Sequence, residues 1–378
     1  MKKILLLTRP ICSPWDEGSK NFAYTLAKYA SDFEIHILTC GSLADLADNI
    51  VQHQIYTSPK LDFSQKFRLF KFLKKANDFD IIHSLFTPTK LNSFFIKFAL
   101  KSKKAKFIQT VATLREDLYS EGDFKKILFG DQIITYSDYA KEKLEKMGFD
   151  KIKRIYPGID IEKYSPSPKN QELMKKLETS EDDFVINYAG EYVRLGDMDD
   201  IIETFIGLVE TRLIASLQGE IKKNFKLHLA VRVKNEKDAN KKKEIIKKLE
   251  RENILDRVAF IDDGSYEMQD IFNLCDISIF PARTMAGKFD IPLAVIEAMA
   301  CGKPVVASNL ERIKYFLSNE NSILIAPGNR EVLKENILYL YNNPEKRYDL
   351  AKKAIRFVRE NFDIMKVVKE YEEVYEKL

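Results

Sequence analysis

The stretch that decides the fold is KFDIPLAVIEAMACGKPVVAS, which runs from Lys288 to Ser308. The pattern predicts a loop, a short helix opened by small residues, a turn at Gly302 and Pro304, and then a buried β-branched strand. Glu297 lies near the start of this helix. Because helix starts bind anions and a carboxylate one turn in can accept hydroxyl groups, the stretch is suited to holding a sugar or ribose.

Similar apolar runs alternate with amphipathic segments along the whole chain. Runs that are apolar on both faces and separated by helices predict parallel sheets covered on both sides. Before the Ser165–Pro168 linker, the expected strands are Lys3–Thr8, Glu34–Thr39, Asp80–Leu85, Lys106–Val111, Gln132–Tyr136 and Lys153–Tyr156. After it, they are Phe184–Ala189, Lys226–Val231, Arg257–Asp262, Ile277–Phe280, Pro304–Ala307 and Ile323–Ala326. Two such series predict an α/β protein with two doubly wound domains.

Composition narrows the class of protein. The chain has 378 residues, of which 45% are hydrophobic, which is enough for two domains with large cores. Its 61 basic and 57 acidic residues nearly balance, so a general nucleic-acid binder is not expected. The four cysteines lack metal-site spacing, and the apolar run after Met1 is too short for a signal peptide or a membrane span. We therefore expect a reduced, cytoplasmic protein.

One region departs from this balance. Between Lys60 and Lys106 there are 12 basic and 3 acidic residues, a local charge of +9 against +4 for the whole chain. Phenylalanines alternate with these charges at helical spacing, at Phe63, Phe67 and Phe70 and again at Phe94, Phe95 and Phe98. The pattern predicts two basic amphipathic helices suited to an anionic membrane surface. The alternative is that the phenylalanines pack inward and the lysines are only solvated.

The stretch around Glu297 resembles the donor-binding signature of family 4 glycosyltransferases. In that family, a glutamate, seven residues and a second glutamate precede Ala-Met-Ala-x-Gly-x-Pro-Val-Val. Glu297 matches the second glutamate, whereas Phe289 stands at the place of the first and Asp290 follows it. The resemblance covers nearly the whole chain and implies the GT-B fold, in which two doubly wound Rossmann-like domains face each other across a cleft.

The resemblance also implies that the two domains bind different substrates. Residues 1–167 are expected to form the acceptor-binding domain and residues 168–364 the nucleotide-sugar-binding domain. The final helix, 365–378, is expected to pack back on the first domain. The donor is then a UDP- or GDP-sugar, which is bound as a substrate without a metal or other cofactor.

Three further segments are candidate donor contacts. Gly18 and Ser19 follow the first strand and open a helix, which is the form of a phosphate cradle, although an ordinary βα turn has the same pattern. After the strand that ends near Ala189, the family carries two cations for the donor diphosphate. Here Glu191 and Leu195 occupy those places. Gly190 and Arg194 are the remaining candidates in this loop, and the alternative for Arg194 is an ordinary surface arginine.

The stretch itself supplies the remaining candidates. Asp290 is a candidate catalytic residue in place of the missing glutamate, or else a turn or N-cap residue. Lys288 is a second candidate catalytic residue, within reach of a diphosphate. Leu293 and Ala294 offer backbone N–H groups, and Glu297 offers a carboxylate to the ribose.

We therefore expect a retaining, hexosyltransferase-like enzyme that moves a sugar onto a glycan, lipid-linked or small-molecule acceptor, as in cell-envelope glycan biosynthesis. It would be cytoplasmic and peripheral at the inner face of the membrane, with residues 60–106 against anionic lipid. One alternative is a catalytically impaired GT-B subunit that binds nucleotide or a partner. Another is a nucleotide-sugar epimerase, which the block after Glu297 disfavours.

Overall fold

The computed structural model describes the whole chain except residues 14, 16, 45, 102, 218–223, 263 and 265. The chain forms two compact units. The first contains Met1–Ile159, Gly287–Ile291 and Asn361–Leu378, and the second contains Asp160–Ala286 and Pro292–Glu360. The short segment Gly287–Ile291 therefore belongs to the first unit although both of its flanks belong to the second.

The first unit is built on a seven-stranded parallel sheet in the order β3-β2-β1-β4-β5-β6-β7. Its strands are β1 (Lys3–Leu7), β2 (Glu34–Leu38), β3 (Ile50–His53), β4 (Ile81–Ser84), β5 (Lys106–Val111), β6 (Gln132–Thr135) and β7 (Ile152–Arg154). Six of them coincide with the strands expected from the sequence. The edge strand β3 was missed, because its four residues include only two apolar ones, Ile50 and Val51.

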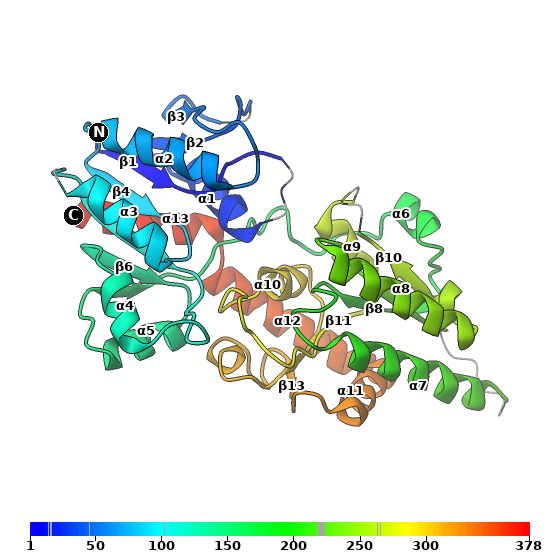
Figure 1. Ribbon diagram of the computed structural model, residues 1–378. Coiled ribbons are helices and arrows are strands. Elements are labelled where there is room, and N and C mark those ends of the chain that lie inside the picture. Colours follow the sequence, from blue (N-terminus) through cyan, green and yellow to red (C-terminus); the bar gives the residue numbers. More distant parts are fainter. Residues whose placement is uncertain are drawn as a thin grey trace. The chain divides into compact units, whose positions relative to one another are not determined.

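Helices cover this sheet (Figure 1). They are α1 (Gly18–Tyr29), α2 (Phe63–Lys75), α3 (Lys90–Leu100), α4 (Glu121–Ile127), α5 (Asp138–Lys146) and the C-terminal α13 (Ile364–Lys377). In α13, residues such as Val367, Tyr371 and Tyr375 are buried in the same core as Phe22 of α1. His83 of β4 lies in this core, with its ring nitrogens 2.7 Å from the hydroxyls of Tyr375 and Thr110.

The second unit has a six-stranded parallel sheet in the order β10-β9-β8-β11-β12-β13. The strands are β8 (Asp183–Tyr188), β9 (Asn224–Leu229), β10 (Val258–Phe260), β11 (Ile277–Phe280), β12 (Val305–Ser308) and β13 (Ile323–Ile325). All six were expected from the sequence. The prediction of two doubly wound parallel sheets is therefore confirmed.

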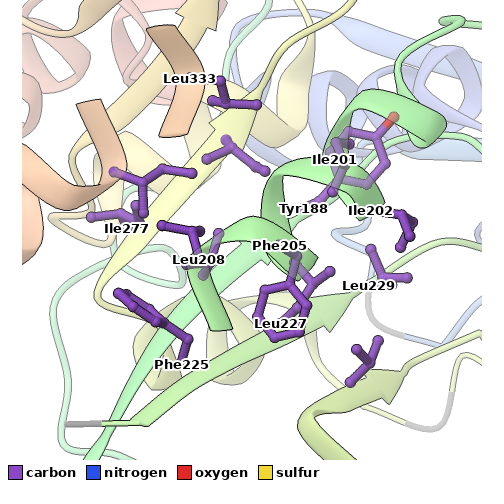
Figure 2. Packing of buried hydrophobic residues seen from close by; sticks show 14 of the residues in the cluster. Tyr188, Ile201, Ile202, Phe205, Leu208, Phe225, Leu227, Leu229, Ile277 and Leu333 are labelled. Atoms are coloured by element: carbon purple, nitrogen blue, oxygen red, sulfur yellow. The ribbon is translucent and has the colours of Figure 1, made fainter. Parts of the chain in front are cut away.

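The second sheet is covered by α6 (Gln171–Lys176), α7 (Met198–Leu217), α8 (Glu236–Arg251), α9 (Met268–Leu274), α10 (Leu293–Ala300), α11 (Arg330–Asn342) and α12 (Pro344–Asn361). Short 3-10 helices occur at Leu255–Arg257 and Ile313–Tyr315. Apolar side chains of α7 pack on the strands, as Figure 2 shows for Phe205 beside Leu227 and Leu229. Over the described part of the chain, no helix has an apolar stretch of the length needed to cross a bilayer.

The strand orders locate the ligand-binding edges. Successive strands run outward in opposite directions from the β1–β4 pair in the first sheet and from the β8–β11 pair in the second. In open parallel sheets of this kind, ligands bind beyond the carboxyl ends of the strands where the order reverses. The loops after β8 and β11 are therefore the place to look for a nucleotide site in the second unit.

Candidate active site

The loop after β8 is wound around one buried hydroxyl group. Tyr188, the last residue of β8, donates from its hydroxyl to both carboxylate oxygens of Asp197, at 2.9 and 3.0 Å, and accepts from the backbone N–H of Glu191 at 3.2 Å. The tyrosine ring lies over Gly190, where an added Cβ would stand 2.1 Å from the ring. Gly190 therefore lets Tyr188 shape the loop, and its backbone stays half-buried at the carboxyl edge of the sheet.

A buried carboxylate stands in this loop where the family has a cation. Glu191 is 7% exposed, and its carboxylate oxygens lie 2.9 Å from Nε of Arg194 and 3.4 Å from Nζ of Lys234. One negative and two positive charges leave the cluster with a net charge of +1. Arg194 is half-exposed, so it is both an ion-pair partner of Glu191 and accessible to a ligand. Leu195 is fully buried.

A second cationic cluster lies at the same edge. Asp200, in the first turn of α7, accepts two bonds from Arg283, from Nε at 2.6 Å and from the terminal nitrogen at 2.8 Å, and a third from Nε of Arg330 at 2.6 Å. Burial raises the pKa of Asp200, but the bonds from the two guanidinium groups outweigh it and hold the pKa below its usual value. The side chains of Arg283 and Arg330 are 50% and 44% exposed, so this cluster also presents a net charge of +1 to solvent.

The helix α10 begins without a side-chain cap. Its N-cap residue is Pro292, and no capping bond is made there by the described residues, so the N–H groups of Leu293 and Ala294 are directed away from the helix. Both residues are half-buried. The helix start therefore has the donors that an anion or a sugar oxygen requires.

Glu297 sits one turn further along α10. Burial raises the pKa of its carboxyl group from 4.5 to about 7, against the lowering effects of a hydrogen bond from the Tyr164 hydroxyl and of the charge on Lys163. Lys163 is itself paired with Glu267 at 2.8 Å. Glu297 is thus a half-buried carboxyl group, oriented by a tyrosine and close to changing its charge near neutral pH.

The segment before α10 lies in the first unit, and Asp290 anchors it there. Asp290 is fully buried, with its Oδ2 2.9 Å from Oγ of Ser137 and its N–H donating to the carbonyl of Ala112 at 3.0 Å. Phe289 packs edge-on against Tyr136 with ring centroids 5.7 Å apart. Lys288 is half-buried. The two residues at the place of the family's first glutamate therefore hold a loop on the carboxyl edge of the first sheet.

Gly18 and Ser19 form the first turn of α1, at the carboxyl edge of the same sheet. The N-cap residue Glu17 makes no capping bond with the residues that the structure describes, and instead pairs with Arg9 at 2.8 Å. The helix start thus has the donors expected of a phosphate cradle. The candidates Gly18, Ser19, Lys288 and Asp290 thus belong to the first unit, and Gly190, Arg194, Leu293, Ala294 and Glu297 to the second.

His83 takes no part in these sites. It is fully buried, and burial lowers the pKa of its imidazole to about 3. It is therefore neutral at physiological pH and joins β4 to α13 through Tyr375, which favours the interpretation as a packed strand-end residue.

Comparison with known sequence families agrees with this geometry. Residues 17–163 match Glycosyltransferase Family 4, and residues 169–357 match Glycosyl transferases group 1. The chain belongs to the group 1 glycosyltransferases. The family resemblance expected from the residues around Glu297 is therefore confirmed, and the protein is a glycosyltransferase.

Individual relatives of this glycosyltransferase cover almost its full length. An uncharacterized glycosyltransferase of Methanocaldococcus jannaschii is 26% identical over 379 residues, covering 94% of this chain and 89% of the relative. The N-acetyl-alpha-D-glucosaminyl L-malate synthase of Bacillus anthracis is 21% identical over 96% of this chain and 95% of its own. The crystal structure of Anabaena HepE in complex with UDP-glucose superposes with a TM-score of 0.78 at 17% identity, covering both chains entirely. The GT-B fold is therefore confirmed.

Proposed function

We propose that this glycosyltransferase transfers a hexose from a UDP-sugar to an acceptor, with retention of the anomeric configuration, and that the second unit holds the donor. The observation that carries the proposal is Glu297, a half-buried carboxyl group hydrogen-bonded by Tyr164 behind the uncapped start of α10. Support for uridine as the base comes from HepE, whose structure holds UDP-glucose. A GDP-sugar is the alternative donor.

The two cationic clusters are the proposed site of the diphosphate. In each cluster two cations surround one carboxylate and leave one positive charge at the carboxyl edge of the second sheet: Arg194 and Lys234 beside Glu191, and Arg283 and Arg330 beside Asp200. Together they complement the two negative charges of a nucleotide-sugar diphosphate. Because the leaving UDP gains negative charge as the glycosidic bond breaks, cations held in place before the reaction stabilise the transition state.

The chemistry itself then depends on positioning and electrostatics rather than on a protein nucleophile. Lys288 and Asp290 remain the proposed catalytic groups beside the transferred sugar. The carboxylate of Asp290 accepts from Ser137 through Oδ2, and a contact with the sugar would use its other acceptor sites or replace that bond. The alternative is that Asp290 only positions the loop from Gly287 to Ile291.

The residues that replace the family's motif residues favour a second function. Phe289 stands where the family has a glutamate, and Glu191 and Leu195 stand where it has cations. A chain with these changes that binds nucleotide-sugar but transfers poorly would act as a binding or partner subunit. Measured release of UDP from UDP-glucose, with and without added acceptors, separates the two: sustained release supports the enzyme, whereas binding without release supports the subunit.

A panel of nucleotide-sugars tested by thermal unfolding identifies the donor. A ligand at 100 times its dissociation constant adds about 2.7 kcal/mol to the free energy of unfolding. UDP-glucose is expected to raise the melting temperature more than GDP-mannose does. The opposite order would assign a guanosine donor.

The basic region of the first unit is the proposed contact with an anionic membrane surface, which makes the enzyme a peripheral protein at the inner face of the membrane. Support comes from α2 and α3, on which five phenylalanines are exposed among lysines: Phe63, Phe67, Phe94, Phe95 and Phe98. Exposed aromatic side chains mixed with basic ones are typical of interfacial helices.

A further inference from the structure

An apolar pocket opens between α2 and α3 in the first unit. It has a volume of about 100 Å³, and ten of its twelve lining residues are apolar, the exceptions being Lys66 and Asn92. The two helices lie side by side on one face of the sheet (Figure 1). The lining includes buried core residues of both helices, such as Leu73 and Ile96, so the pocket reaches from the exposed surface of the helix pair to the core beneath it.

The position of the pocket links it to the ligand-binding edge of the sheet. Most of its lining comes from the first halves of the two helices, including Phe67 on α2 and Leu91 on α3, and from Phe86, which follows β4. Helices that follow parallel strands begin at the carboxyl ends of those strands. The pocket therefore opens at the same edge of the sheet as Gly18 at the start of α1.

The lining does not suit water. A buried water molecule needs two to four polar partners, and this pocket offers only two polar side chains among twelve. Three of the lining side chains are also strongly exposed: Phe63 at 83%, Phe67 at 61% and Leu91 at 55%. An apolar occupant would cover this apolar surface, and its removal from water would favour binding.

The basic residues around the pocket indicate that its occupant also carries an anionic group. Lys66 lines the pocket, and Arg68, Lys71 and Lys75 follow on the exposed positions of α2. Across the described ranges, none of these four has a carboxylate within ion-pair distance. Their charges are therefore uncompensated and complementary to an anionic group at the mouth of the pocket.

We infer that the acceptor of this enzyme is an anionic lipid, whose hydrocarbon chain enters the pocket between α2 and α3 and whose phosphate lies beside Lys66. The inference rests on the proposed transferase function and names the class of its acceptor. Binding of a single chain explains why apolar lining, exposed phenylalanines and the uncompensated charge of Lys66 occur together at this edge of the sheet. A pocket for a protein helix would not require the anionic group.

Calorimetric titration with dodecyl phosphate below its micelle concentration tests the inference. The full chain is expected to bind one molecule. Phe67→Ser is expected to weaken binding about tenfold, because the side chain forms part of the pocket. Tyr348→Ser is the matched control: Tyr348 is 64% exposed on α12 of the second unit and does not line the pocket, so binding should be unchanged.

Lys66→Gln tests the anionic end. It is expected to weaken dodecyl phosphate about threefold, the effect of one exposed ion pair, and to leave dodecanol binding unchanged. Lack of saturable binding, or equal loss in the Phe67 and Tyr348 variants, would overturn the inference. UDP-glucose titrated into the same proteins separates the two proposals: if it binds while dodecyl phosphate does not, only the lipid acceptor is wrong. If only dodecyl phosphate binds, the proposed UDP-glucose donor is wrong instead.

Discussion

Ser137 donates a hydrogen bond to Asp290, with Oγ 2.9 Å from Oδ2 and both residues buried. Ser137 is also the N-cap of α5, where its Oγ accepts from the N–H of Ala140. The bond ties the loop before α10 to the first sheet, at the position where related enzymes carry their first motif glutamate. A catalytic contact of Asp290 would therefore come from a carboxylate that Ser137 already orients.

Asp290→Ala is expected to lower turnover about 10²-fold, the effect of losing one transition-state contact, if Asp290 reaches the sugar. Ser137→Ala is the matched control, because it removes the same hydrogen bond but no carboxylate. Steady-state kinetics with UDP-glucose compares them. Full activity of Asp290→Ala would refute the catalytic role, and equal losses in the two variants would show that Asp290 acts only by holding the loop.

Arg194→Ala and Arg283→Ala are each expected to weaken the binding of UDP far more than that of uridine, because only UDP carries the diphosphate. A charge-assisted hydrogen bond contributes about 1.5–3 kcal/mol, so the loss of UDP affinity should be about tenfold or more. Calorimetry with both ligands measures the difference. Arg356→Ala, at an exposed position on α12, is the control that should change neither affinity. Equal loss of UDP and uridine in either variant would remove that arginine from the diphosphate site.

Glu297 should make stability depend on pH. Its pKa is about 7 in the folded chain and near 4.5 in the unfolded one, so the folded state retains the proton between these values. Proton binding by Glu297 therefore stabilises the folded state fully below about pH 4.5. This stabilisation is lost as the pH rises from about 4.5 through 7. Histidines such as His83 and His228, whose pKa values burial lowers to about 3, act in the opposite direction, so the measurement must compare variants.

The comparison is between wild type and Glu297→Gln, unfolded in urea at several pH values. As the pH rises through this window, the wild type is expected to lose stability relative to Glu297→Gln. Above the window, the difference in stability should stay constant. A difference that does not change with pH would mean that Glu297 has an ordinary pKa.

Vesicle sedimentation tests the membrane contact. The double variant Lys71→Glu, Lys75→Glu is expected to bind phosphatidylglycerol vesicles at least about tenfold more weakly, since each basic residue near the surface contributes about 1 kcal/mol. Added salt should weaken wild-type binding as well. The matched control is Lys243→Glu, Lys247→Glu on the exposed face of α8. Equal losses in the two double variants, or indifference to lipid charge, would contradict a contact specific to α2.

The sheets could be predicted from the sequence because most of their strands are short apolar runs, buried on both faces. β3 could not, since half of its short length is polar. The start of α10 and Glu297 were predictable because they are contiguous in one motif. No pattern in the sequence predicts that Gly287–Ile291 belongs to the first unit. Asp290 contacts Ser137 and Ala112, which are far away in the sequence.

The cationic cluster on Asp200 was also missed. Arg283 precedes α10, but its partner Asp200 and the second cation Arg330 come from the starts of two other helices. Only the sheet order brings these segments to one edge. Acidic residues in the first turn of a helix, such as the two at the start of α7, are typical of a helix-dipole interaction and do not by themselves predict arginine partners.

The most direct test of the central claim is the affinity of UDP-glucose for Glu297→Gln at pH 8, where the wild-type carboxylate is ionised. Loss of a charge-assisted bond from the ribose should weaken binding about tenfold or more, since such a bond contributes about 1.5–3 kcal/mol. Tyr164→Phe, which removes only the residue that orients the carboxylate, should weaken it less. An unchanged dissociation constant for Glu297→Gln, measured by calorimetry on folded protein, would contradict the assignment of the donor site to α10.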